Sequence, residues 1–329
     1  MTATVLALAS LAAAVPSPDA LTPAADTVVI EQWTVPWPES RPRDPYVAPD
    51  GRVWFVGQRS DYVAVFDPAS ESFEKIDLPE GAGPHNLIVD DQGVIWYAGN
   101  RNATIGRLDP ESGEITELSM PLEGARDPHT LVFGAGQDIW FTLQGSNMVG
   151  HLDTASRQIH LLPVPTEGSR PYGIAVGTDG RVWFNQVGVN QLGVIDPEKM
   201  EVREIVLPRE EARDRRIGIT SDGAVWYVDW GAGHLGRVDP ETEEVREWPV
   251  PGGKDARPYG MAVDDRDRIW FVETGSDPNR LLGFDPTTGE FFSQTEIDSG
   301  AVRHMFFHQV SRTIWFGTDS NTLARFRVP

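Results

Sequence analysis

Short apolar runs alternate with polar turn clusters along most of the chain. Between residues 84 and 122, β-branched and aromatic runs cover 84–89, 94–98 and 104–108, and polar and apolar residues alternate over 114–118. Runs of this length, bounded by turn residues, predict β-strands. The turn before the fourth run, Asp109–Gly113, begins with Asp-Pro and ends with Gly, as a type I turn prefers. The segment therefore predicts four strands joined by tight turns.

The same pattern recurs seven times, each time around a Trp that is followed by Phe or Tyr. The Trp residues stand 42 to 45 positions apart and are Trp54, Trp96, Trp140, Trp183, Trp226, Trp270 and Trp315. The Asp-Pro turn recurs as well, at Asp67, Asp109, Asp196, Asp239 and Asp285. A period of this length with four strands per repeat predicts an all-β, seven-bladed β-propeller.

The two ends of the chain predict how the ring closes. The seventh repeat stops at Arg325–Pro329, in what reads as its third strand, so its fourth strand is missing. Residues Glu31–Pro36 resemble the fourth strand of another repeat, Glu247–Pro251. We therefore predict that the N-terminal strand completes the last blade, which removes the exposed edges of an open array.

Bulk properties narrow the class of protein. The net charge of -21 argues against nucleic-acid partners, which require a basic surface. Cysteine is absent, so disulfides and thiolate chemistry are excluded. Residues 1–26 contain the apolar run Val5–Val15, which is too short to span a membrane as a helix. It reads as a signal-peptide-like leader or, alternatively, a disordered tail. We expect one propeller domain over 27–329, secreted or periplasmic, monomeric and without a membrane span.

One end of the central channel is the expected place for a site. The start of each first strand should lie beside the end of the second strand, about three residues after the Trp. The predicted first-strand positions are Tyr46, His85, His129, Tyr172, Ile217, Tyr259 and His304. The predicted second-strand positions are Gly57, Gly99, Leu143, Gln186, Asp229, Glu273 and Thr318.

These residue types allow catalysis, but they also allow simple packing. Histidine suits general base or metal-ligand work near neutral pH. The adjacent carboxylates Asp229 and Glu273 could orient a histidine or hold a hard cation. The alternative is that duplication placed similar rings at the inner rim with no further role.

Arginine precedes or opens the first strand in most repeats, in a chain with few basic residues. These residues are Arg43, Arg126, Arg170, Arg216, Arg257 and Arg303. Guanidinium groups bind carboxylates and carbonyls in bidentate fashion, so a small anionic or carbonyl-rich ligand is one interpretation. Salt bridges between blades are the other. Trp230 lies on the same predicted face and could cover an apolar ligand.

The repeat resembles the virginiamycin B lyase (streptogramin lyase) family over residues 30–329. The motifs are Arg257–Met261 with Trp270–Glu273, and Asn102–Arg107. The resemblance implies a Mg²⁺-dependent elimination that opens cyclic depsipeptides. It also implies a His at the start of the first strand and a Glu at the end of the second strand of the sixth repeat. Glu273 matches that Glu, whereas Tyr259 stands at the His position and Ile217 at a further functional His position.

Three hypotheses remain open at this point. The first is a metal-assisted C–O lyase acting on a small ester, lactone or cyclic depsipeptide. Its base would be His304, with Tyr259, His85 and His129 as further candidates, and its metal ligands would be Glu273 and Asp229. Substrate contacts would come from Tyr46, Tyr172, Arg126, Arg170, Arg257, Arg303 and Trp230. The second is an exported propeller that binds a ligand or serves as a scaffold without catalysis. The third is a lactonase-like propeller hydrolase with carboxylates holding Ca²⁺.

Overall fold

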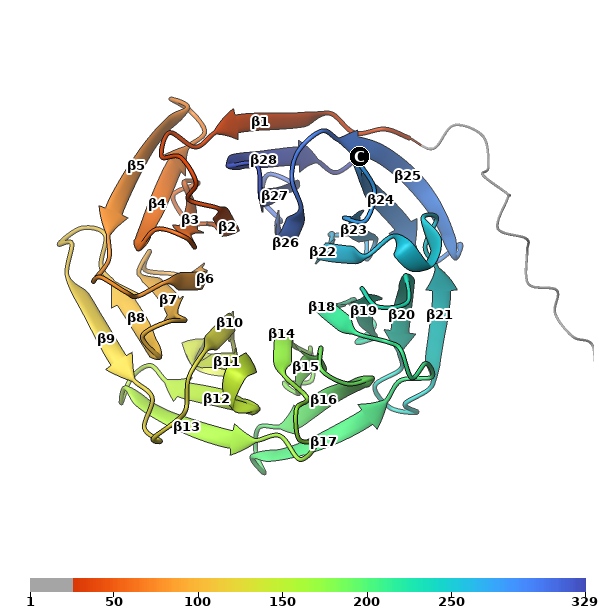
Figure 1. The fold of residues 1–329 in the computed structure, drawn as a ribbon, viewed down its shortest axis with the longest axis horizontal. Helices are drawn as coiled ribbons and strands as arrows, with labels where there is room; N and C mark the ends of the chain where they lie inside the picture. The colour runs from red at the N-terminus through yellow and green to blue at the C-terminus, as the bar shows by residue number, and fades with distance from the viewer. Residues whose placement is uncertain (1–25) are drawn as a thin grey trace, which may run out of the picture.

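Seven four-stranded antiparallel sheets form a closed ring around a central channel, which confirms the predicted propeller (Figure 1). The structure is a computed structural model that describes residues 26–329. The expected leader over 1–26 therefore lies outside the described residues except for Asp26. Within residues 26–329, no helix is long and apolar enough to cross a membrane.

Within each blade the strands follow one another from the channel outward. The first three blades are β2 (Pro42–Val47), β3 (Val53–Gly57), β4 (Tyr62–Asp67) and β5 (Ser72–Asp77); β6 (Pro84–Val89), β7 (Ile95–Gly99), β8 (Thr104–Leu108) and β9 (Ile115–Ser119); and β10 (Pro128–Phe133), β11 (Ile139–Leu143), β12 (Met148–Asp153) and β13 (Gln158–Pro163). The fourth to sixth are β14 (Pro171–Val176), β15 (Val182–Gln186), β16 (Gln191–Asp196) and β17 (Glu201–Val206); β18 (Asp214–Ile219), β19 (Val225–Asp229), β20 (His234–Val238) and β21 (Val245–Pro249); and β22 (Pro258–Val263), β23 (Ile269–Glu273), β24 (Asn279–Asp285) and β25 (Glu290–Ile297). Short 3₁₀ segments lie at η1 (Ala135–Gln137), η2 (Gln144–Ser146) and η3 (Gly253–Asp255).

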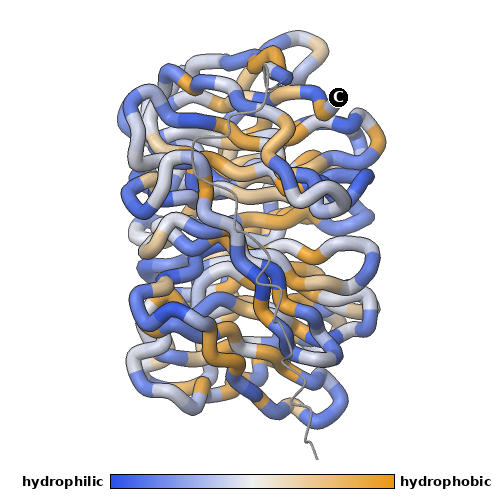
Figure 2. Tube along the Cα trace, turned by 90° about the vertical axis from the view of Figure 1, so that its right-hand side faces the viewer, coloured by the Kyte–Doolittle hydropathy of each residue, from blue (hydrophilic) through white to orange (hydrophobic). Residues whose placement is uncertain are grey.

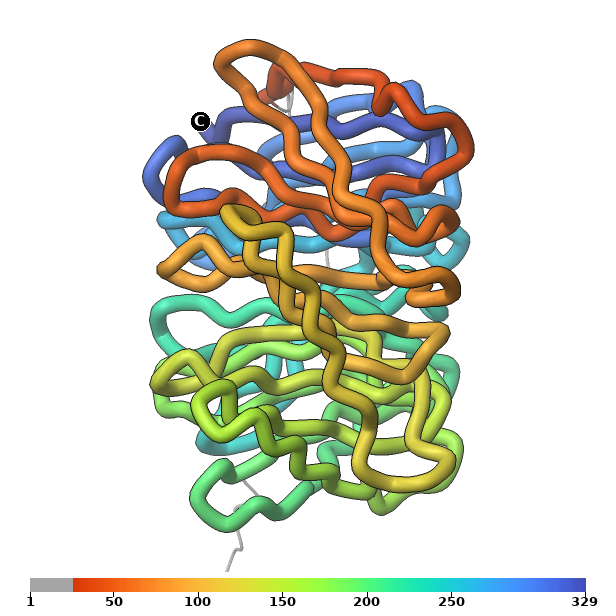
Figure 3. Tube along the Cα trace, turned by 90° about the vertical axis from the view of Figure 1, so that its left-hand side faces the viewer, coloured from red at the N-terminus to blue at the C-terminus, as the bar shows by residue number. Residues whose placement is uncertain are grey.

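The seventh blade combines both ends of the chain, as predicted. It contains β26 (Val302–His308), β27 (Thr313–Thr318), β28 (Thr322–Arg327) and β1 (Ile30–Thr34). β1 pairs antiparallel with β28, with Trp33 opposite Leu323. Figure 3 shows the N-terminal strand lying beside the C-terminal strands. Just before β1, the Asp26 amide donates to the Phe292 carbonyl at 3.0 Å, so the N-terminal segment also contacts the outer strand of the sixth blade.

The Trp-aromatic pairs form the core between blades. Each Trp and its following Phe or Tyr is buried, and Figure 2 shows hydrophobic stretches inside the ring with hydrophilic turns at its two faces. The Trp270 indole donates to the Asp264 carboxylate at 2.8 Å, which fixes the ring at the start of its strand. Gly106, in the Ile-Gly-Arg motif, lies under the Tyr97 ring, where a Cβ would overlap it. The period in the sequence therefore reports packing between blades.

Candidate functional site

The strand register defines two layers of side chains at one end of the channel. Each first strand begins opposite the last residue of its second strand, for example Pro258 opposite Glu273. The predicted second-strand positions, from Gly57 to Thr318, are confirmed in all seven blades. The next residue of each first strand forms the first layer: Arg43, His85, His129, Tyr172, Arg215, Tyr259 and Arg303. The residue after that forms the second layer: Asp44, Asn86, Thr130, Gly173, Arg216, Gly260 and His304.

Three predicted first-layer positions are wrong. Tyr46 pairs with Trp54, three residues beyond Arg43, and packs on Phe306 with ring centroids 4.3 Å apart. Ile217 pairs with Tyr227 in the apolar wall of the channel, and Arg215 takes its expected place. His304 belongs to the second layer, because the β26–β27 hairpin is one residue longer than that of the sixth blade. In the first layer, Arg43, Arg215 and Arg303 therefore stand where Tyr46, Ile217 and His304 were predicted.

Rings from the second, third and fourth blades stack across the first layer, and a ring from the sixth blade joins them. The ring centroids are 3.7 Å apart for His85 and His129, and 4.1 Å apart for His129 and Tyr172. Tyr172 continues to Tyr259 across the channel through a hydrogen bond between the two hydroxyls. Burial, followed by nearby guanidinium charges, holds the pKa of both histidines well below the usual range. Both imidazoles are therefore neutral at pH 7.

The two tyrosines differ in acidity. Burial by itself would raise the pKa of Tyr259, but the charges of Arg43, Arg216 and Arg215 outweigh it and lower the pKa to about 8. Burial and the neighbouring Tyr259 raise the pKa of Tyr172. The pair therefore loses its first proton easily and its second with difficulty, as expected for two acids that share a site.

The arginines divide into a group paired with carboxylates and an exposed group. Arg43 contacts Asp44 at 3.4 Å, and Arg216 lies 3.7 Å from Asp44. The half-buried Arg303 donates from Nε and Nη2, one edge of its guanidinium, to Asp319 at 2.6 to 3.2 Å. Of these ion pairs, only Arg216–Asp44 joins two blades, as the salt-bridge interpretation predicted; the other two lie within one blade.

The second group lies on the rim and remains accessible to a ligand. Arg126, Arg170 and Arg257 are exposed, and Arg170 and Arg257 have the positive φ values of 55° and 50°. The guanidinium carbons of Arg215 and Arg257 lie 4.4 and 5.0 Å from the centroid of the Trp230 ring. This aromatic ring beside two positive charges suits an aromatic or carbonyl-bearing molecule.

The carboxylates expected to bind a metal are occupied by other partners. One oxygen of Glu273 accepts from the Gly252 amide at 2.7 Å, and the other forms an ion pair with Arg280 at 2.5 Å. One oxygen of Asp229 accepts from the amides of Arg213, Gly231 and Ala232 at 2.8 to 3.1 Å. Among residues 26–329, no three His, Asp or Glu side chains gather as a ligand set. A guanidinium bound to Glu273 and arginines in the adjacent layer do not fit a Mg²⁺ site at these residues.

Sequence reasoning also missed a buried acid beside this site. Asp214 begins β18 and accepts a hydrogen bond from Asn185 at 2.6 Å, while its other oxygen has no partner. Burial raises the pKa of Asp214 to about 7. A count of eleven residues back from Trp226, applied strictly, would have reached Arg215 and drawn attention to this segment.

Comparisons with known proteins decide the family. The family model "Virginiamycin B lyase family" matches residues 20–281, well over half of the chain. The chain belongs to the virginiamycin B lyase family. This confirms the resemblance seen in the sequence. A search of curated proteins finds no match.

Solved structures of lyases share the fold. The virginiamycin B lyase of Staphylococcus aureus matches with a TM-score of 0.83 at 23% identity, covering 92% of this chain and 99% of that one. A streptogramin B lyase matches with a TM-score of 0.80 at 26% identity, covering 92% and 98%. A catalytically inactive histidine-to-alanine variant of the S. aureus enzyme, with quinupristin, has a TM-score of 0.81 at 23% identity, covering 92% and 99%.

Proposed function

We propose that this protein is a C–O lyase for small esters or lactones, and that the Tyr259 phenolate, rather than a histidine, is its base. One observation carries the proposal: the only tyrosine with a lowered pKa lies in the channel layer, between a second tyrosine and several arginines. A base with a pKa near the working pH is the kind that catalyses proton transfer well.

The chemistry is an elimination next to a carbonyl. Tyr259 takes the proton from the carbon next to the carbonyl, and that electron pair forms a carbon–carbon double bond. The bond from the neighbouring carbon to the ester oxygen then breaks, and a carboxylate leaves. Arg215 and Arg303 lie over the Tyr259 ring at 5.0 and 5.7 Å. Their charges would stabilise the negative charge that develops on the carbonyl oxygen.

The donor groups of the site support this route without a metal step. Glu273, which the family resemblance matched, is paired with Arg280, and Asp229 accepts hydrogen bonds from backbone amides, so we assign neither carboxylate a part in the proton transfer. The rim residues Trp230, Arg257 and Arg170 would bind the body of the substrate. The arginine-rich face favours an anionic or carbonyl-rich molecule.

A binding propeller without catalysis is the second candidate, and one observation favours it. Tyr259 is only 2% exposed, and its hydroxyl is hydrogen-bonded to Tyr172. A substrate must separate the two hydroxyls before a proton can be transferred. If this does not happen, the arginine-rich face would bind its ligand and release it unchanged. We infer export for either function, because Val5–Val15 is an apolar run of about signal-peptide length.

Incubation with quinupristin, the ligand of the related lyase, distinguishes these functions by mass spectrometry. Elimination gives a ring-opened isomer of unchanged mass with a new double bond, whereas hydrolysis adds one water. We expect the isomer, at a rate that rises with pH through about 8 and is lost in Tyr259→Phe. Tyr46→Phe is the matched control, because Tyr46 lies away from the first layer. Binding without turnover would establish the second candidate, and addition of water would refute the lyase.

A further inference from the structure

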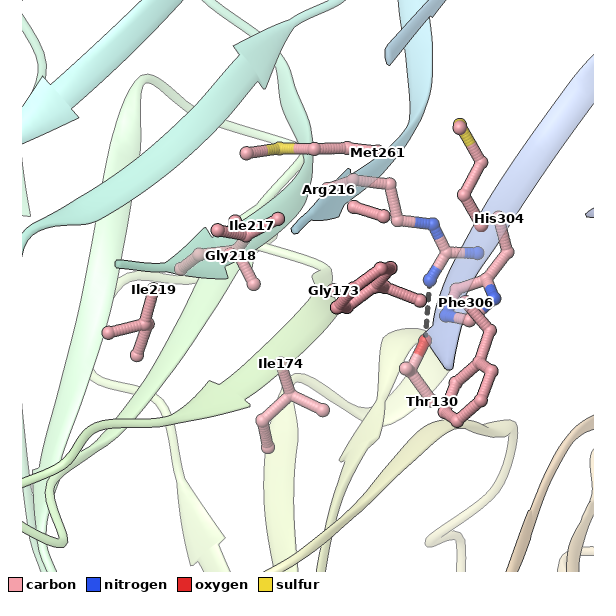
Figure 4. A pocket seen from close by; sticks show the side chains of 14 residues that line it. Thr130, Gly173, Ile174, Arg216, Ile217, Gly218, Ile219, Met261, His304 and Phe306 are labelled. Carbon is pink, nitrogen blue, oxygen red and sulfur yellow. Dashed lines mark hydrogen bonds between the residues drawn. The ribbon is translucent and has the colours of Figure 1, made fainter. Parts of the chain in front are cut away.

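A cavity of about 270 Å³ lies in the channel on the inner side of the two polar layers. Its apolar wall consists of residues further along four first strands, namely Ile174, Ile217, Ile219, Met261, Val263 and Met305. Thr130, Arg216 and His304 of the second layer line its polar end. Figure 4 shows the guanidinium of Arg216 beside Thr130 and His304, with Ile174, Ile217 and Ile219 on the other side of the view.

The polar end contains buried groups with free hydrogen-bonding capacity. Arg216 is 3% exposed; its Nε donates to the Arg303 carbonyl at 2.8 Å and its Nη1 to Thr130 Oγ1 at 3.3 Å. Its Nη2 lies 3.7 Å from Asp44 Oδ2 and makes no hydrogen bond, and Nδ1 of His304 makes none either. Burial lowers the pKa of His304 to about 4, so its neutral imidazole can donate from Nδ1. Buried polar groups are costly unless they are satisfied, so both nitrogens have capacity for an acceptor in the cavity.

The local charge favours an anion as that acceptor. The guanidiniums of Arg43 and Arg216 face one carboxylate, Asp44, at 3.4 and 3.7 Å. Asp44 is itself held ionised, because the charges of Arg43 and Arg216 outweigh burial and lower its pKa. Two positive charges against one negative charge leave an excess that a carboxylate would neutralise. A carboxylate also matches the geometry of a guanidinium.

The rest of the cavity requires an apolar body. Ile217, Ile219 and Val263 are only partly buried although they lie inside the channel. Apolar side chains around a water-accessible cavity gain free energy when an apolar group covers them. An apolar cavity of about 150 Å³ holds one benzene molecule, so this cavity has room for a ring and a short chain.

We propose that this cavity is a second binding site, which takes a small molecule with an apolar body and a carboxylate head bound by Arg216 and His304. The site differs from the proposed catalytic face, because the first layer lies between them and the Tyr172–Tyr259 hydrogen bond spans the channel there. It does not depend on any lyase activity. The ligand would enter from the opposite face of the ring.

Isothermal titration with sodium 3-phenylpropanoate tests this site, with 3-phenylpropan-1-ol as the uncharged comparison. We expect saturable binding of the carboxylate, and at least about tenfold weaker binding of the alcohol, because hydrogen bonds to charged groups are the stronger ones. Ile219→Trp fills the cavity and should abolish binding. Val310→Trp adds the same side chain at a 90% exposed position of the β26–β27 loop and should bind normally.

Further variants separate this site from the catalytic face. Arg216→Met should weaken carboxylate binding at least about tenfold while the alcohol is affected little, with near-ultraviolet circular dichroism as the check that it folds. Tyr259→Phe should leave binding unchanged. Equal affinity for acid and alcohol, undiminished binding in Ile219→Trp, or no saturable binding to the wild-type protein would each overturn the proposal.

Discussion

Replacing Tyr259 with Phe should remove the one phenol in this protein that ionises near neutral pH. The chain has six tyrosines, and the pKa of each of the other five is raised above its usual value. Burial is the first cause of the raised pKa for all five. Arg43, Arg216 and Arg215 lie near both Tyr172 and Tyr259, and the first proton of this pair is lost from Tyr259. A titration between about pH 7 and 9 therefore reports on this pair alone.

The size of the effect follows from the charges around the ring. A fall in pKa from 10.0 to about 8 corresponds to about 2.7 kcal/mol in favour of the phenolate. The guanidinium carbon of Arg215 lies 5.0 Å from the centroid of the Tyr259 ring. One positive charge at that distance stabilises the phenolate by about 3 kcal/mol at an effective dielectric constant of about 20. Several arginines together therefore offset the cost of burial and leave the net stabilisation. About one tenth of the molecules carry the phenolate at pH 7.

Ultraviolet difference absorbance measures this phenolate directly. The wild-type protein should show one phenolate forming around pH 8, and the transition should move in Tyr259→Phe, because Tyr172 then titrates without its partner. Tyr46→Phe should titrate like the wild type, because burial raises the pKa of Tyr46. Arg215→Met should shift the transition to higher pH. Identical titrations of the wild type and Tyr259→Phe would refute the charge argument and, with it, the proposed base.

Three further predictions test the fold and its buried charges. Deleting β1 (Ile30–Thr34) should greatly lower the melting temperature, because it exposes the edge of β28. Adding the free β1 peptide should partly restore it. An unchanged melting curve would disprove closure by this strand. In the folded protein the pKa of Asp214 is raised to about 7. The stability that its protonated carboxyl contributes is therefore complete below about pH 4 and is lost as the pH rises through 7. Asp214→Asn should therefore gain stability over the wild type across that range, by at most about 4 kcal/mol in urea unfolding, and a pH-independent difference would contradict this. Glu273→Gln should lower the free energy of unfolding by about 1 to 3 kcal/mol, because it weakens the contacts with Arg280 and the Gly252 amide. Mg²⁺ should not raise the wild-type melting temperature more than a monovalent salt of equal ionic strength. A Mg²⁺ effect that disappears in Glu273→Gln would show that a metal binds there.

The period of the sequence was sufficient for the fold, because packing between blades repeats. Every blade buries its Trp and the aromatic residue after it, so duplication preserves these residues at a constant spacing. The strand ends that face the channel, such as Asp229 and Glu273, could be counted from the same Trp residues. Closure by the N-terminal strand was also predictable, since a ring with one missing strand requires a partner.

The site depended on details that the period does not record. The expected first-strand positions included Tyr46 and Ile217, whereas strand register places Arg43 and Arg215 there. A hairpin one residue longer moves His304 into the second layer and brings Arg303 into the first. Because side chains alternate between the two faces of a strand, a shift of one residue changes what each of them contacts.

The sequence by itself determined a seven-bladed propeller with an arginine-rich channel mouth. Only the tertiary structure decided which charges meet. It joined Glu273 to Arg280, placed Arg43, Arg215 and Arg216 around the Tyr172–Tyr259 pair, and left Arg216 with an unpaired nitrogen above an apolar cavity. Glu273 and Arg280 belong to neighbouring strands of one blade, whereas the arginines around the tyrosine pair come from blades one to five repeats away. The energies of these contacts depend on burial and on distances of a few ångströms, which no spacing along the chain specifies.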